Sequence, residues 1–209
     1  NLLRNVLTSL SDIATWPCDE INYIWRHGNI FHPSDEFTKD MVTPDISKYI
    51  RRQFKWVVDR YKVHTVVEKT CANSLRVDFV NHVIPEAKFI FIYRDGFDAL
   101  GSAMKRWRAK LNLPYLLRKA RFVPKSDLPY YALRFFKSQL YKTFSRDNRA
   151  AFWGPMLDNM DYLLTKYSLE EVCALQWKRC VDKAEQGLME IDHKLWMSVS
   201  YEKFVQYPQ

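Results

Sequence analysis

The feature that most constrains this chain is an apolar run that ends in a charged turn. The run is Lys88-Phe89-Ile90-Phe91-Ile92-Tyr93, and Arg94-Asp95-Gly96 follows it at once. A short, near-continuous apolar run is typical of a parallel strand that is covered on both faces. The sequence therefore predicts a buried parallel strand that ends in a polar turn.

An amphipathic segment follows this turn, from Asp95 to Arg108. Asp95 is a favourable helix N-cap, and Asp98 can complete a capping box with it. The apolar positions recur at helical spacing, so we expect a helix with one buried stripe. That predicted stripe consists of Phe97, Leu100, Met104 and Trp107.

Strand and helix patterns alternate along the rest of the chain. Further strands are predicted at 63–68 and 195–200, and further helices at 2–10, 34–61 with a break at Thr43-Pro44, 73–83, 129–144, 168–187 and from about 201. Alternation of this kind predicts an α/β fold with three layers, α/β/α, around a mostly parallel central sheet. A chain of 209 residues suits one domain, in which 110–165 is predicted to be a helical or loop insertion or a lid.

Ligands of open parallel sheets bind where the strands end, which directs attention to Glu68-Lys69-Thr70 and Arg94-Asp95-Gly96. Arg94 is expected beside a helix N-terminus, and its guanidinium can grip a phosphate with two hydrogen bonds. Ser102, within the first turns of that helix, can bond the same phosphate. The alternative is that Arg94 only pairs with an aspartate at the edge of the core.

Composition limits the kind of phosphate site that this sequence can contain. It has five glycines and none at the spacing of a glycine-rich phosphate loop. The net charge of +8 suits an anionic partner, although a merely basic surface explains it equally well. The four cysteines lack metal-site spacing; Cys173 and Cys180 suit core packing, and disulfide pairing stays open.

Several of these segments resemble conserved elements of the sulfotransferases. Glu68-Lys69-Thr70 resembles their EKT/EKS element, and the segment 85–98 together with Ser102 is similar to their 3′-phosphate-binding segment. Ser200-Tyr201-Glu202-Lys203-Phe204, closing on Tyr207-Pro208, is similar to their late YE-x-[LF] element. Phe152-Trp153-Gly154-Pro155 and Ala174-Leu175-Gln176-Trp177 resemble the bacterial-type members. The matches keep family order across most of residues 1–209.

The resemblance implies a P-loop NTPase-like sulfotransferase fold and the donor 3′-phosphoadenosine-5′-phosphosulfate (PAPS), which leaves as adenosine 3′,5′-bisphosphate (PAP). Arg94 and Ser102 would bind the 3′-phosphate, Tyr201 would lie near the adenine, and no metal is implied. Lys69 would face the sulfuryl group or the acceptor. The 5′-phosphosulfate loop of the family is expected before Asn1 and its final helix after Gln209, so the single domain is predicted to be shortened at both ends.

Sulfuryl transfer to a hydroxyl or amine also needs a general base. Relatives often supply a glutamate shortly after the first helix, and Glu20 stands in that region. Asp19 and His27 are its rivals, and Glu20 is equally explained as a surface carboxylate.

Two other classes of function remain open from the sequence. One is a P-loop-type nucleotide kinase, and the other is a non-catalytic basic module that binds anions. Basic residues between 105 and 125 permit the second and equally permit an acidic-acceptor site; they are Lys105, Arg106, Arg108, Lys110, Arg118, Lys119, Arg121 and Lys125.

The acceptor is not identified by these motifs. A small molecule, a carbohydrate, a lipid or a peptide tyrosine, with or without acidic groups, suits the pattern. Nucleic acid is not expected as a partner, because no DNA- or RNA-binding motif occurs. No apolar run is long enough for a membrane span, and the bacterial cytoplasm is the expected location, with the Golgi lumen as the alternative.

Overall fold

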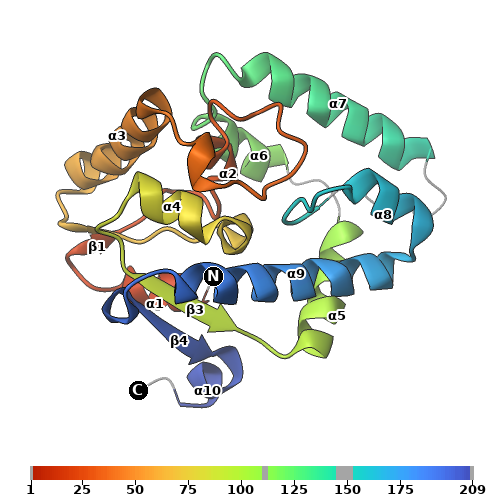
Figure 1. The fold of residues 1–209 in the computed structure, drawn as a ribbon. Helices are drawn as coiled ribbons and strands as arrows, with labels where there is room; N and C mark the ends of the chain where they lie inside the picture. Colours follow the sequence, from red (N-terminus) through yellow and green to blue (C-terminus); the bar gives the residue numbers. More distant parts are fainter. Residues whose placement is uncertain (1, 110–112, 145–152, 208–209) are drawn as a thin grey trace.

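The computed structural model describes residues 2–109, 113–144 and 153–207 (Figure 1). Its α-helices are α1 (Leu2–Leu7), α2 (Asn22–Trp25), α3 (Pro44–Tyr61), α4 (Val77–Val83), α5 (Gly96–Trp107), α6 (Leu113–Ala120), α7 (Leu128–Phe144), α8 (Met160–Lys166), α9 (Leu169–Met189) and α10 (Tyr201–Gln206). Its strands are β1 (Ile13–Ala14), β2 (Thr65–Val66), β3 (Phe89–Tyr93) and β4 (Trp196–Ser200), and its 3-10 helices are η1 (Lys39–Met41), η2 (Cys71–Leu75) and η3 (His193–Leu195). Helices and parallel strands therefore alternate, as an α/β fold requires.

The strands of the described segments form two parallel pairs, β1 with β2 and β3 with β4. They do not join there into the one central sheet that the alternation predicts, and the strand predicted at 63–68 shortens to Thr65–Val66. The physical reason is that local patterns specify element types but not which strands pair. In the longer pair Tyr93 lies opposite Ser200, so residues 94 and 201 follow at the same edge.

β3 is covered on one face only, which corrects the prediction of a strand buried on both. Phe89 and Phe91 pack against the core between α4 and α9, together with Ala184 and Leu188. Ile90 on the other face is 40% exposed. An apolar run cannot reveal this difference, because it indicates only that both faces could be buried. Figure 1 shows β3 and β4 side by side, with α9 running past them.

The largest core cluster lies between α2, α3 and α4. Helix α3 begins at Pro44 after an N-cap from Thr43, whose hydroxyl accepts a hydrogen bond from the Ile46 N–H at 3.3 Å. This confirms the break predicted at Thr43-Pro44, although the predicted helical pattern before it becomes only η1. Phe54 on α3 meets the rings of Trp16 and Trp25 edge to face, at centroid distances of 4.9 and 5.6 Å.

The helix predicted at 73–83 is interrupted at Arg76, which has a φ of −146° and separates η2 from α4. The side chain of Arg76 is buried and donates to the Asn73 and Asn22 side chains at 2.8 and 2.5 Å. These bonds fix the backbone in a non-helical turn at this position. Hydrophobic periodicity alone continues across the break and therefore misses it.

Helix α5 follows the prediction at its start but not on all of its surface. The Asp95 carboxylate caps it by accepting from the N–H groups of Phe97 and Asp98, at 2.9 and 3.2 Å. The predicted capping box does not form, because the Asp95 N–H donates to Glu202 at 2.9 Å instead of to Asp98. Trp107 is fully buried, whereas Phe97 is 88% exposed and does not belong to the buried stripe.

Helix α9 packs across both α4 and α5. The added Cβ of any residue at Gly187 would lie 2.7 Å from the Cβ of Val77, so glycine permits the close approach of α9 to α4. Val172, Cys173, Gln176 and Ala184 are buried on its inner side. The four cysteines are free thiols in this structure.

The first turn of α9 allows a direct test of helix capping. Ser168 and Glu171 form a capping box at this helix start. Replacing Ser168 with alanine is expected to lower the free energy of unfolding by about 1 kcal/mol, because the Glu171 N–H loses its acceptor. Urea denaturation followed by circular dichroism measures the change. Ser198→Ala, on the exposed part of β4, serves as the control, and an equal effect in both variants contradicts the capping role.

The segment 110–165 contains α6, α7 and all of α8 except its last residue. Three residues of the sequence predictions, Lys110, Phe152 and Pro208, lie outside the described residues. None of the helices in the described ranges is long and apolar enough to cross a membrane. Within the same ranges no group of three or more His, Cys, Asp or Glu side chains is arranged to hold a metal ion.

Candidate functional site

The three residues predicted to hold the 3′-phosphate and adenine lie together at the end of the β3–β4 pair. The Arg94 guanidinium donates to the Ser102 hydroxyl at 3.2 Å. The same guanidinium stacks over the ring of Tyr201, with its carbon 4.8 Å from the ring centroid. Arg94 and Tyr201 meet because each directly follows one of two paired parallel strands. We call Arg94, Ser102 and Tyr201 the Arg94 group.

The surroundings of the Arg94 group combine a helix N-terminus with two carboxylates. Asp98 lies 3.4 Å from an Arg94 nitrogen and is 65% exposed, so this ion pair is open to solvent. Arg94 therefore contacts Ser102 and also pairs with an aspartate, as the alternative interpretation of Arg94 expects. Glu202 binds the Asp95 N–H and ties α10 to the start of α5.

The two predicted catalytic residues form an ion pair at the end of β2. The Lys69 ammonium donates to the Glu20 carboxylate at 2.6 Å and to the Cys71 sulfur at 3.2 Å. Burial opposes the charge on Glu20, but the neighbouring Lys69 outweighs it and lowers the pKa of Glu20. Burial also opposes the charge on Lys69, and Cys71 and Glu20 outweigh it and raise the pKa of Lys69. Glu20 is therefore a carboxylate and Lys69 an ammonium at neutral pH.

Thr70 explains why Glu20 reaches Lys69 from a different part of the chain. Its hydroxyl accepts a hydrogen bond from the Ile21 N–H at 3.1 Å and donates to Glu68 at 2.5 Å. Glu68 also accepts from Asn73 at 2.7 Å, and burial raises the pKa of Glu68 to about 7. This bonding fixes the loop after Pro17 against the end of β2. Glu68, Lys69 and Thr70 thus act as one unit in the structure.

The rivals of Glu20 are bound elsewhere. Asp19 pairs with Arg4 at 3.3 Å. The His27 Nδ1 lies 2.8 Å from the Asp127 carboxylate, and the His27 ring packs on Tyr49. Of the three candidates, Glu20 is the one that contacts Lys69.

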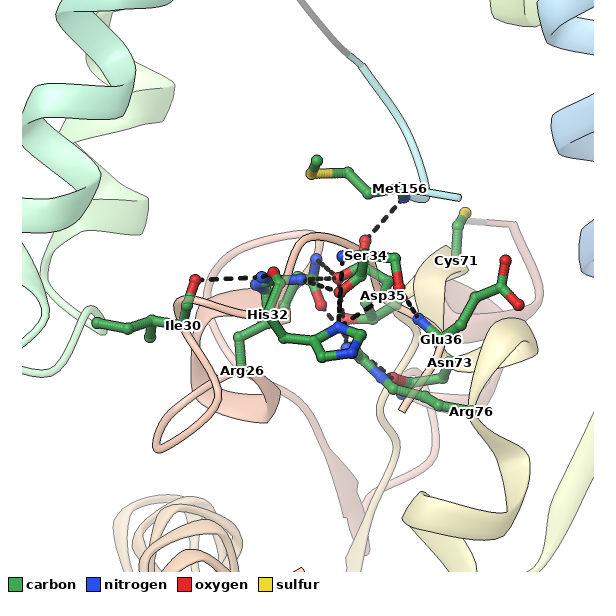
Figure 2. Close-up of polar contacts among 12 residues, drawn as sticks. Arg26, Ile30, His32, Ser34, Asp35, Glu36, Cys71, Asn73, Arg76 and Met156 are labelled. Atoms are coloured by element: carbon green, nitrogen blue, oxygen red, sulfur yellow. Dashed lines mark hydrogen bonds and ion pairs between the residues drawn. The ribbon is translucent and has the colours of Figure 1, made fainter. Parts of the chain in front are cut away.

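Sequence reasoning missed a buried network of charges beside this site. Asp35 accepts from the Arg26 guanidinium at 2.8 Å and from the Met156 N–H at 2.9 Å, and it lies 3.5 Å from Arg76. Figure 2 shows the side chains of Arg26, Asp35 and Arg76 close together, with the backbone of Met156 beside Asp35. The Arg76 charge helps to lower the pKa of Asp35 against the effect of burial. We call Arg26, Asp35 and Arg76 the Asp35 network.

Phe37 completes the packing of the Asp35 network. The guanidinium carbons of Arg26 and Arg76 lie 5.3 and 5.2 Å from the centroid of its ring. Arg26 also donates to the backbone carbonyls of Ser34 and His32, at 2.6 and 2.5 Å. No periodic pattern marks these residues in the sequence.

A second link joins two of the motifs that resemble bacterial-type members. The Gln176 side chain on α9 donates to the carbonyls of Trp153 and Pro155, at 3.0 and 2.8 Å. Gln176 is itself buried, and its carbonyl oxygen accepts from the Trp107 indole at 3.4 Å. The next residue, Trp177, lies over Gly96, where an added Cβ would be 3.3 Å from the ring. Helix α9 therefore connects these motifs to the start of α5.

Comparison with known protein families gives a match over part of the chain. The sequence model of the sulfotransferase family matches residues 4–141, which is more than half of the chain. No curated protein and no solved structure gives a match. The matched segment contains Glu20, Lys69, Arg94 and Ser102, while Tyr201 lies beyond it. By the extent of this match, the chain belongs to the sulfotransferase family.

Proposed function

We propose that this chain transfers the sulfuryl group of PAPS to a hydroxyl or amine acceptor, with a P-loop NTPase-like, three-layer sulfotransferase fold. The observation that carries the proposal is the Arg94 group at the joint end of two parallel strands. An arginine fork, a hydroxyl and a helix N-terminus together suit a phosphate ester better than a neutral ligand. The family membership supplies the reaction.

The residues of the Arg94 group fit a 3′-phosphorylated nucleotide. The Arg94 Nε is buried and has no hydrogen-bond partner within the described residues, so the fork has unused donor capacity. A 3′-phosphate would take bonds from Arg94 and Ser102, and the Tyr201 ring beside them would contact the adenine. This placement also explains why no glycine-rich loop is needed for the 3′-phosphate.

The Glu20–Lys69 pair fits the transfer step. Glu20 would accept the proton of the acceptor hydroxyl, whose oxygen attacks the sulfur as the bond from sulfur to the 5′-phosphate oxygen breaks. PAP leaves with the electron pair of that bond, and Lys69 would neutralise charge that develops on the transferred group or the leaving phosphate. The step forms one sulfur–oxygen bond and breaks another, with no covalent intermediate on the protein.

Replacing Arg94 with alanine is the direct test of donor binding. We expect the dissociation constant of PAP to rise by about 10- to 100-fold, because charge-assisted hydrogen bonds to the 3′-phosphate are lost. Isothermal titration calorimetry measures it. Arg106→Ala, on the exposed end of the same helix, is the matched control and should leave the constant unchanged. If Arg94→Ala binds PAP as tightly as the wild type does, Arg94 does not belong to the donor site.

Thermal-shift assays separate this proposal from a nucleotide kinase and from a non-catalytic anion binder. PAP should raise the melting temperature more than ATP with magnesium does. A larger shift with ATP and magnesium favours a kinase, and binding of PAP without transfer of labelled sulfuryl to any of a panel of acceptors favours the non-catalytic module. A single domain over 1–209, an insertion or lid at 110–165 and a bacterial cytoplasmic location, with the Golgi lumen as the alternative, belong to the same proposal.

A further inference from the structure

A groove with basic and aromatic walls lies between α3 and the segment that follows α6. Its volume is about 560 Å³. We call it the basic aromatic groove and define it by Trp56, Arg60 and Tyr61 of α3 and Arg121, Phe122 and Lys125 of the facing segment. Neither the Arg94 group nor the Glu20–Lys69 pair lines it.

The charge of the basic aromatic groove has one sign. Three of its lining residues, Arg60, Arg121 and Lys125, are cationic, and none of its lining residues is acidic. These three side chains are exposed, and they make no ion pair with any carboxylate of the described segments. Three unpaired cations around one groove attract an anionic ligand and repel a cationic one.

Two aromatic side chains of the groove are partly open to solvent. Trp56 is 40% and Tyr61 42% exposed, although large aromatic side chains are usually more deeply buried. Phe122 meets the Trp56 indole at 67°, and Tyr61 meets it at 85°. Neither of these two rings is parallel to the Trp56 indole, so neither can sandwich a planar base against it. A sugar ring needs only one open aromatic face for its C–H groups.

The groove adjoins the candidate catalytic pair. Pro17 lines the groove, and Glu20 lies three residues further along the same loop. Lys119, two residues before Arg121, is close enough for its charge to help lower the pKa of Glu20. Burial and Lys69 have larger effects on that pKa. A ligand longer than one sugar unit can therefore lie in the groove and extend toward Glu20.

We propose that the basic aromatic groove binds an anionic saccharide, the acceptor of the transfer reaction. A sugar ring stacks on Trp56, and carboxylate or sulfate groups contact Arg60, Arg121 and Lys125. This inference rests on the proposed function for the role of acceptor, but saccharide binding itself does not. It gives the basic residues after α6 a ligand of defined chemistry.

Calorimetric titration of the protein with an unsulfated chondroitin hexasaccharide, without donor, tests the inference. Maltohexaose provides the neutral saccharide, and hexaglutamate provides the anion without sugar rings. The chondroitin hexasaccharide should bind, and the affinity should fall as salt is raised to about 1 M. Arg121→Gln/Lys125→Gln and Trp56→Ala should each weaken binding by about tenfold. Lys105→Gln, an exposed charge outside the groove, is the control.

Three outcomes would overturn the inference: no binding of the hexasaccharide, equal binding of hexaglutamate, or equal weakening in Lys105→Gln. Because Trp56→Ala removes part of the ring cluster, its melting temperature is compared with that of the wild type. If Trp56→Ala is unfolded, the test depends on Arg121→Gln/Lys125→Gln. A failure of the proposed function alone gives a result that differs from these three outcomes. The hexasaccharide then binds in the groove, but no labelled sulfuryl group is transferred to it or to any other acceptor.

Discussion

Replacing Asp35 with alanine is expected to lower the free energy of unfolding by about 3–5 kcal/mol. Asp35 is fully buried, and its carboxylate is the shared anion of Arg26 and Arg76 in the Asp35 network. Without it, two guanidiniums remain buried without the carboxylate that they share. Its bond to the Met156 N–H is lost as well, so of the two bonds between Asp35 and Met156 only the one from the Asp35 N–H to the Met156 carbonyl remains.

Urea denaturation at neutral pH measures this effect. Asp182→Ala is the matched control, because Asp182 pairs with Lys178 on the surface of α9 and should contribute less than about 1 kcal/mol. The contribution of Asp35 has a defined pH dependence. Since the folded state lowers its pKa below the usual 3.8, the contribution is present above that pH and is lost as the pH falls further. A loss no larger than that of the control contradicts the role of the Asp35 network.

Replacing Glu20 with glutamine is expected to reduce turnover by about 10²- to 10⁴-fold while PAP binding stays unchanged. The amide keeps the shape of the side chain but cannot accept the proton of the acceptor. Transfer of labelled sulfuryl measures turnover, and calorimetry measures PAP binding. Asp19→Asn is the control, because its carboxylate pairs with Arg4 and not with Lys69. Near wild-type turnover in Glu20→Gln excludes Glu20 as the base.

The pH profile distinguishes a base from a residue that only maintains the local structure. A base works in its ionised form, so activity is lost as the pH falls through its pKa. Lys69 holds the pKa of Glu20 below the ordinary 4.5, so the acid limb of kcat/KM should lie below pH 4.5. Lys69→Gln leaves burial as the main influence and should move that limb above pH 4.5. If the acid limb stays at the same pH in Lys69→Gln, Glu20 is not the group that accepts the proton.

The sequence predicted the elements of this fold better than their assembly. The β3–α5 unit was predicted because an apolar run and the Asp95 cap are local signals. The single covered face of β3, the exposure of Phe97 and the break at Arg76 depend on which elements lie nearby. Pairing of strands far apart in the chain has no local signal, so the two separate strand pairs were not predicted.

The candidate site could likewise be predicted from the sequence only in part. The sequence could place Arg94 and Ser102 together, because Arg94 ends a strand and Ser102 lies eight residues later in the helix that follows it. Resemblance to a family, and not spacing, indicated that Glu20 and Lys69 belong to one site, 49 residues apart. The Asp35 network could not be predicted, because charged residues look alike in a sequence whether they are exposed or buried. Only the neighbours that satisfy them distinguish the two cases.

The pairing of β3 with β4 has a consequence for the order in which the molecule folds. The bond from the Asp95 N–H to Glu202 closes a loop of 107 residues, more than twice the separation between Glu20 and Lys69. Closing a longer loop costs more chain entropy, and contacts between distant residues form more slowly. During synthesis the Arg94 group must also wait for Tyr201 to leave the ribosome. The Glu20–Lys69 pair would therefore form before the Arg94 group is complete.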